Sequence, residues 1–131
     1  MTVRDDRVVR DALERIGLAL TSGNAGAVAD LWDVPGLVLA DQGVRAIGSR
    51  AEVAAFFEQA IHAYRERGTP RAVPDDVRVT WVTDRIAAVS VDWIGRDAQG
   101  GEREREGSFY LMRVGDDGVA RVQVAMGRAG G

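Results

Sequence analysis

The sequence predicts an α+β fold in which helices pack on one face of a curved sheet. Two observations support this. Apolar residues recur at helical spacing up to about residue 67, and from Val77 onward they alternate with polar residues in the period of two that is typical of strands. A chain of 131 residues suits one domain, covering 1–131, with one core. We expect residues 1–4 and 127–131 to be flexible tails.

The first half of the chain predicts two helices in succession. One covers about Asp5 to Thr21, and Gly23 is placed to end it as a C-cap. Asn24 can N-cap a second, short helix that carries Trp32 on its apolar side and is broken at Pro35. The apolar residues that share the face of the first helix are Val9, Leu13, Ile16 and Leu20.

Two short strands and a third helix follow. We expect strands over 37–40 and 44–47, with Asp41 in the turn between them. Ser49 and Glu52 have the spacing of a capping box, in which each side chain accepts a hydrogen bond from the other residue's backbone N–H. The third helix therefore begins after Ser49, and Gly68 and Pro70 end it.

The second half of the chain predicts an antiparallel meander. The connections GRDAQGGE and GDDG suit hairpins between strands that alternate in polarity. The run from Glu102 to Glu106 alternates in charge, and we interpret it as a solvated strand arm that discourages aggregation.

Composition excludes several classes of function. The net charge is −3 and no basic cluster interleaves with aromatic residues, so we expect no nucleic-acid partner. There is no Cys and His62 stands alone, so we expect no metal site and no cofactor. No apolar run is long enough to span a membrane, and the N-terminus is too charged for a signal peptide. We therefore expect a cytoplasmic protein with no membrane partner.

Three segments carry a resemblance to a known family. They are the LTSGN turn at 20–24, the SVDWIGR strand at 90–96 and the ending at 109–127. In element order and spacing, the chain resembles the nuclear transport factor 2-like superfamily, which includes ketosteroid isomerases and SnoaL-type polyketide cyclases. This implies a cone-shaped α+β fold, in which a mixed or antiparallel sheet and three N-terminal helices enclose a cavity lined by every second strand residue.

The cavity implied by the resemblance would be apolar with a few polar groups, which is usual for a small-molecule site. A small-molecule-binding domain is therefore the first functional hypothesis, with an apolar molecule as the ligand. A core filled by the same aromatic residues remains the alternative. The residues that we expect to contact a ligand are Trp32, Phe56, Trp81, Val91, Trp93, Ser108, Met112, Val124 and Met126.

The second hypothesis is an isomerase, cyclase or dehydratase. The resemblance places Asp41 near the general base of ketosteroid isomerases and Tyr110 near their oxyanion donor. The tyrosine that those enzymes use as their other donor falls near Ile16, which disfavours steroid isomerisation by the family mechanism. Asp41 could instead cap its own turn, and Tyr110 could be a core tyrosine.

The face of the sheet that points away from the cavity predicts a homodimer. Many proteins of this superfamily dimerise there, and a mixed polar and apolar patch suits a two-fold contact. The residues expected on this outer face are Ser90, Asp92, Phe109, Leu111, Arg113, Arg121 and Gln123.

Overall fold

The computed structural model describes residues 4–128, which form three helices and six strands. The α+β class is confirmed, although one of the three helices has only five residues. The elements in chain order are α1 (Asp6–Ser22), α2 (Ala25–Ala29), β1 (Trp32–Ala40), β2 (Gly43–Ile47), α3 (Arg50–Glu66), β3 (Arg71–Trp81), β4 (Ile86–Arg96), β5 (Glu102–Val114) and β6 (Ala120–Gly127).

The helix ends follow the predicted capping residues. Gly23 ends α1 in the left-handed conformation, at φ +76°, and Asn24 accepts a hydrogen bond from the backbone N–H of Ala27 to begin α2. Ser49 accepts from the Glu52 N–H at 3.2 Å, but the Glu52 carboxylate accepts from the Gly48 N–H. The Ser49 half of the predicted capping box is therefore present, whereas Glu52 accepts from the residue before Ser49 and not from Ser49 itself.

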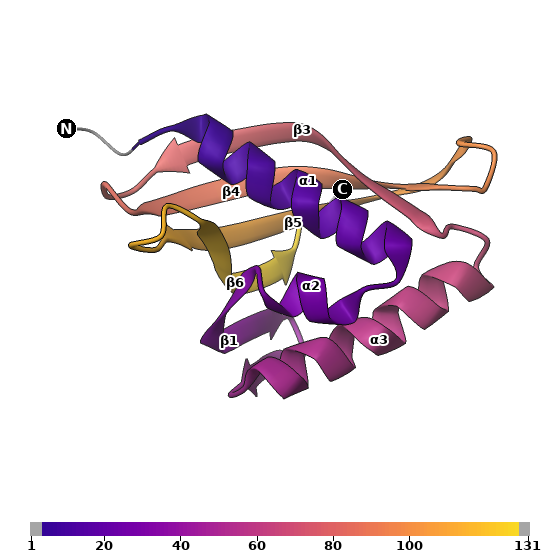
Figure 1. Cartoon of the computed structure of the whole chain (residues 1–131), viewed down its shortest axis with the longest axis horizontal. Helices are drawn as coiled ribbons and strands as arrows, with labels where there is room; N and C mark the ends of the chain where they lie inside the picture. Colours follow the sequence, from indigo (N-terminus) through magenta and orange to yellow (C-terminus); the bar gives the residue numbers. More distant parts are fainter. Residues whose placement is uncertain (1–3, 129–131) are drawn as a thin grey trace.

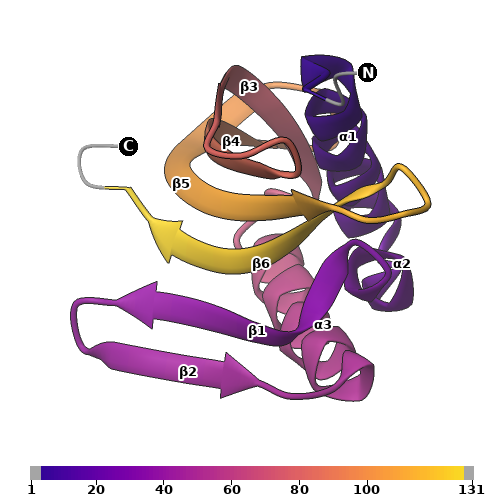
Figure 2. The same cartoon turned by 90° about the vertical axis from the view of Figure 1, so that its left-hand side faces the viewer.

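The six strands form one curved sheet in the order β2-β1-β6-β5-β4-β3 (Figure 1). The β1–β6 pair is parallel, and the four other pairs in the described chain are antiparallel. Seen end-on, β3 to β5 curl over while β1 and β2 extend away, and the helices lie on one side of the sheet (Figure 2). The sheet is therefore mixed, curved and open rather than a closed barrel.

Strand β1 begins five residues earlier than the sequence predicts. Trp32 is its first residue, so Pro35 and Gly36 lie within a strand and not at the break of a helix. The pairing of β1 with β6 shifts register between Trp32 and Leu37. Proline lacks a backbone donor and is tolerated where the hydrogen bonding of a strand is irregular. Because the pairing is irregular here, the side chains of 32–37 show no regular alternation in the sequence.

Strand β3 also begins earlier than expected, at Arg71. Its pairing with β4 shifts register between Asp75 and Arg78, and Asp76 has a positive φ of 47°. The extra residue interrupts the period of two. This irregularity explains why regular alternation in the sequence begins only at Val77.

A bulge in β6 overturns part of the expected cavity wall. Val122 pairs with Met112, but Val124 pairs with Leu111, so Gln123 is the additional residue. One inserted residue reverses the facing of everything beyond it. Val122 stays on the face that is covered by helices, whereas the prediction that Val124 and Met126 point inward is wrong.

The core lies between α1 and the concave face of the sheet. Its largest fully buried side chains include Leu13, Val89, Val91 and Met112. Gly17 brings α1 close to the sheet, because a Cβ added there would lie 2.9 Å from the Ala72 carbonyl oxygen. A larger side chain at position 17 would therefore push α1 away from β3.

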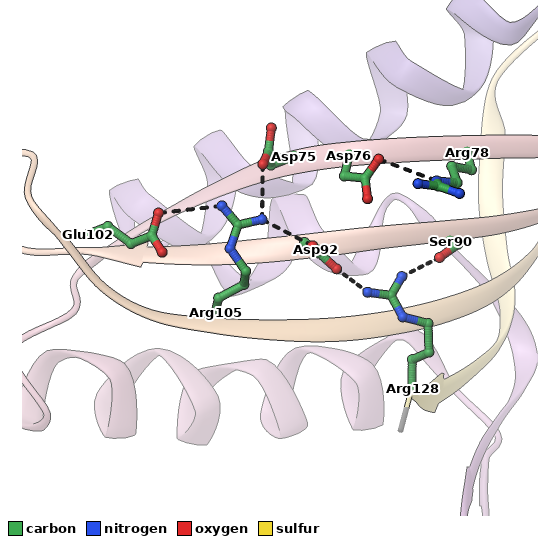
Figure 3. A network of polar contacts seen from close by, with 8 residues as sticks. All are labelled: Asp75, Asp76, Arg78, Ser90, Asp92, Glu102, Arg105 and Arg128. Carbon is green, nitrogen blue, oxygen red and sulfur yellow. Dashed lines mark hydrogen bonds and ion pairs between the residues drawn. The ribbon is translucent and has the colours of Figure 1, made fainter. Parts of the chain in front are cut away.

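A network of charged side chains crosses the opposite face of the sheet (Figure 3). Asp92 is 8% exposed and lies between Arg105, at 3.0 Å, and Arg128. Arg105 also contacts Asp75 at 3.0 Å. These two arginines lower the pKa of Asp92, the Arg105 hydrogen bond having the larger effect.

Three residues that we expected in flexible tails make defined contacts. Arg4 forms an ion pair with Asp84 at 2.9 Å, Gly127 is the last residue of β6, and Arg128 binds Ser90 and Asp92. The remaining tail residues, 1–3 and 129–131, lie outside the described residues.

Candidate functional site

A cavity of about 90 Å³ opens between the C-terminal half of α3, α1 and strands β3 to β5. A buried water needs roughly 10–15 Å³ of such space, so the cavity is large enough for more than one water molecule. The cavity is partly enclosed and has more apolar than polar wall. Its apolar lining comes from Ile16, Leu20, Trp32, Phe57 and Val122.

Two aromatic side chains share a hydrogen bond in the wall of the cavity. The Trp93 indole N–H donates to the Tyr110 hydroxyl oxygen at 2.8 Å. Because an indole can only donate, the hydroxyl hydrogen of Tyr110 remains available for an acceptor. Burial raises the pKa of Tyr110 to about 12, against the opposite effect of hydrogen bonds from Trp93 and Ser108. Tyr110 is therefore a neutral hydrogen-bond donor at physiological pH.

A second polar group lies at the mouth of the cavity, where the end of α3 meets β5. Glu104 forms an ion pair with Arg67 at 2.9 Å, and its carboxylate lies 3.2 Å from the buried Thr69 hydroxyl. That hydroxyl also lies 3.1 Å from the Tyr64 carbonyl oxygen. Since a hydroxyl has one hydrogen, Thr69 donates to one of these two acceptors at a time.

The sequence interpretation missed Glu104 and Glu106 as cavity residues. Four of the five residues in the run that we interpreted as a solvated arm are exposed, as predicted, but Glu104 and Glu106 also line the cavity. The missed signal is that the inward period of Met112, Tyr110 and Ser108 continues backward through these glutamates. The intervening arginine, Arg105, points to the other face and joins Asp92.

Four of the eleven predicted site residues line this cavity, namely Trp32, Trp93, Ser108 and Tyr110. Phe56 does not, because the next residue on α3, Phe57, faces the cavity and lies 5.7 Å from the Trp32 ring. Phe56 instead contacts the guanidinium of Arg45 at 5.2 Å.

Three predicted residues face inward but lie away from the cavity. Val91 and Met112 are fully buried in the core, and neither lines the cavity. Trp81 pairs with Ala87 at the far end of the sheet, where its indole N–H donates to Asp6 at 2.8 Å. A residue that faces inward therefore need not line the cavity, because packed core covers one half of the concave face of the sheet.

The structure does not bring Asp41 and Tyr110 together. Asp41 is exposed in the turn between β1 and β2, outside the cavity that Tyr110 lines. It borders a separate open hollow with Met126 and Arg128. Val124, on the outward face of β6, lines neither space.

The described part of the chain has no grouping of acidic, histidine or cysteine side chains that could hold a metal ion. His62 is exposed on α3 and lies 3.0 Å from Glu66. Within residues 4–128, none of the helices has the length and apolar character that a membrane crossing requires.

Comparison with solved structures shows which proteins share this architecture. An NTF2-like protein from Novosphingobium aromaticivorans matches with a TM-score of 0.74 at 22% identity, covering 97% of this chain and 84% of that one. Aln2 from a Streptomyces species matches with a TM-score of 0.73 at 15% identity, covering 94% and 89%. A candidate ketosteroid isomerase from Shewanella frigidimarina matches with a TM-score of 0.68 at 16% identity, covering 96% and 97%. These identities show the fold alone.

No curated protein matches the chain. A family model described as "NTF2-like protein (DUF6841)" matches residues 5–129, which is nearly the whole sequence. The chain therefore belongs to this family of NTF2-like proteins.

Proposed function

We propose that this protein binds a small, mainly apolar molecule in the cavity between α1, α3 and strands β3 to β5. One observation carries the proposal. A partly enclosed space with apolar walls contains convergent polar groups from Trp93, Ser108 and Tyr110. A ligand site of this kind gains affinity from buried apolar area and orientation from a few hydrogen bonds.

The hydroxyl hydrogen of Tyr110, which the bond from Trp93 does not use, defines the polar end of the proposed ligand. A carbonyl or hydroxyl oxygen next to Tyr110 would accept it, and the neighbouring Trp93 bond would hold the phenol in place. The apolar part of the ligand would then contact Trp32, Phe57 and Val122. A structural neighbour named for ketosteroids supports the idea that this fold can hold an apolar molecule.

No observation favours the enzymatic alternative with Asp41 as the base. That residue lies in an exposed turn outside the cavity, so a ligand bound against Tyr110 would not contact it. Proton transfer requires the base within hydrogen-bond reach of the reacting group.

Filling the cavity tests the proposal. Tryptophan fluorescence of the protein is titrated with benzyl alcohol, a neutral probe with an apolar body and one hydroxyl. Trp32 and Trp93 line the site, so we expect a saturable change in the wild type and its loss in Ser108→Phe. The Phe side chain occupies space that the probe needs.

The matched control is Thr80→Phe, which places the same side chain at an exposed position of β3 outside the cavity. It should bind benzyl alcohol as the wild type does. Equal binding by wild type and folded Ser108→Phe would overturn the proposal. The absence of saturable binding to the wild type would overturn it as well.

A further inference from the structure

The cavity carries a carboxylate that the fold leaves unpaired. Glu106 is a solvent-exposed residue that lines the mouth of the cavity from β5, on the same face as Ser108 and Tyr110. It makes no hydrogen bond or ion pair with another residue of the described range 4–128. Its neighbour on that face, Glu104, is instead neutralised by Arg67 at 2.9 Å. The two glutamates at the mouth therefore differ in what remains free to bind.

Aromatic rings surround the same space. Trp32, Phe57, Trp93 and Tyr110 line the cavity together with Glu106. Tyr64 lines it too, but the Arg67 guanidinium already lies over its ring, 5.1 Å from the centroid. The face of such a ring attracts a cation, most strongly for Trp. A carboxylate next to several aromatic rings is an arrangement that favours an organic cation over a neutral or anionic molecule of the same shape.

The field of Glu106 reaches these rings. Burial has the largest effect in raising the pKa of Tyr64, and the charge of Glu106 comes second, against an opposing effect of Arg67. Glu106 also contributes to raising the pKa of Tyr110. The charge of Glu106 favours a cation at the mouth of the cavity for the same reason that it opposes ionisation of a phenol.

Neither arginine near the mouth forms an ion pair with this carboxylate. Arg67 is paired with Glu104 at 2.9 Å, although its charge also interacts favourably with that of Glu106. Arg71 also lines the cavity, but one of its guanidinium nitrogens lies near Gly100, 3.6 Å from where a Cβ on that residue would be.

We propose that the ligand of this cavity is a small organic cation, an ammonium group attached to a short apolar body, with the ammonium at Glu106 and the body against the aromatic wall. The inference rests on the proposed function and specifies the class of ligand. On this inference Glu106 selects ligands by their charge. Tyr110 can donate a hydrogen bond to any ligand that has an acceptor oxygen.

Three probes of one shape and different charge test it. Dissociation constants are measured by fluorescence titration for benzylamine, benzyl alcohol and benzoate at neutral pH and low salt. We expect benzylamine to bind roughly threefold to tenfold more tightly than benzyl alcohol, which is the effect of one partly exposed ion pair plus a cation–π contact. Benzoate should bind most weakly, and added salt should reduce the preference for benzylamine.

The decisive variant is Glu106→Gln, which keeps the shape of the side chain and removes its charge. It should bind benzylamine and benzyl alcohol equally well, because the charge that favours the ammonium group is gone. The control is Glu102→Gln, with the same change of charge on the same strand but outside the cavity, and it should retain the wild-type preference.

The outcomes separate the two proposals. If benzyl alcohol binds in the cavity but benzylamine binds no more tightly, the inference about the cation is overturned and the binding function stands. If Glu102→Gln loses the preference as fully as Glu106→Gln, the effect is one of net charge, and the inference is overturned as well. If no probe binds, both proposals fail.

Discussion

Trp93 and Tyr110 show how two residues can define a site through one hydrogen bond. The indole donates at 2.8 Å, so the phenol oxygen is satisfied and its hydrogen can be directed to a ligand. Leaving either group unpaired in a buried place would cost about 1–3 kcal/mol, so the pair holds its own geometry. Tyr110 is thus both a structural residue and the best-placed donor of the cavity.

Alkaline titration tests the surroundings of Tyr110. Its pKa is raised from 10.0 to about 12, mainly by burial. Between pH 10 and pH 12 the Tyr110 hydroxyl is ionised in the unfolded chain but stays protonated in the folded one. The free energy of unfolding is therefore highest below pH 10 and falls as the pH rises toward 12. The loss is on the order of 2–3 kcal/mol. The chain has no Lys and only two Tyr, so the tyrosinate absorbance is simple to assign.

Tyr110→Phe should remove the upper transition and leave that of Tyr64, whose pKa is also raised by burial. If the wild type showed both tyrosines ionising near pH 10 in the folded state, the buried position of Tyr110 would be contradicted.

At the scale of elements, the sequence predicts the helices and the central strands well because their signals are local. Caps at Asn24 and Ser49 and the alternation around Tyr110 require no tertiary information. The bulge at Gln123 is different, because it depends on pairing with β5 and leaves no mark in the alternation of Val122, Val124 and Met126. The predicted wall was wrong from that residue onward.

The same reasoning explains the missed glutamates of β5. Charge alternation alone predicts an exposed arm, and most charged residues are exposed. Only the position of α3 shows that one side of the arm faces a cavity and that Arg67 at the helix end reaches Glu104. The sequence therefore indicates which face of the sheet Glu106 lies on, but it does not indicate that α3 and a cavity lie opposite that face.

Gly17 on α1 tests how closely helix and sheet must approach. In Gly17→Ala, the new methyl would lie 2.9 Å from the Ala72 carbonyl oxygen and 3.3 Å from the Trp93 ring. Overpacking costs about 1–3 kcal/mol, whereas alanine gains about 1 kcal/mol of helix propensity over glycine. We expect a net loss of about 1 kcal/mol in the free energy of unfolding, measured by urea denaturation.

Gly26→Ala on α2 is the matched control. Its added methyl would meet only side-chain atoms of Arg50 and Asn24 at 3.5 Å, which is ordinary contact. It should gain up to about 1 kcal/mol from propensity alone. If Gly17→Ala were stabilised to the same degree as Gly26→Ala, the close approach of α1 to β3 would be wrong.

At the scale of the molecule, the outer face of the sheet suits contact with a second copy. Phe109 and Leu111 lie half-buried on this face, and the β6 bulge adds Val124 and Met126 to them. The Asp92 network lies on the same face and presents both signs of charge. A patch of mixed charge around apolar residues is self-complementary across a two-fold axis.

We propose a homodimer through this face, with light scattering as the measurement. The mass at micromolar concentration should be twice the 14.1 kDa of the chain, and Leu111→Arg should reduce it to that of one chain. Arg at the centre of an apolar contact is costly, because an unpaired charge is desolvated there. A wild type of 14.1 kDa would contradict the dimer, although it would leave the cavity unaffected.

The central claim, that the space lined by Trp93, Ser108 and Tyr110 takes up a ligand, is tested most directly by backbone and indole N–H chemical shifts during a titration with benzyl alcohol. We expect the largest changes at the Trp93 indole and at the amides of β4 and β5 that border the cavity. Changes confined to the hollow around Asp41 and Met126, or uniform small changes along the chain, would contradict this account.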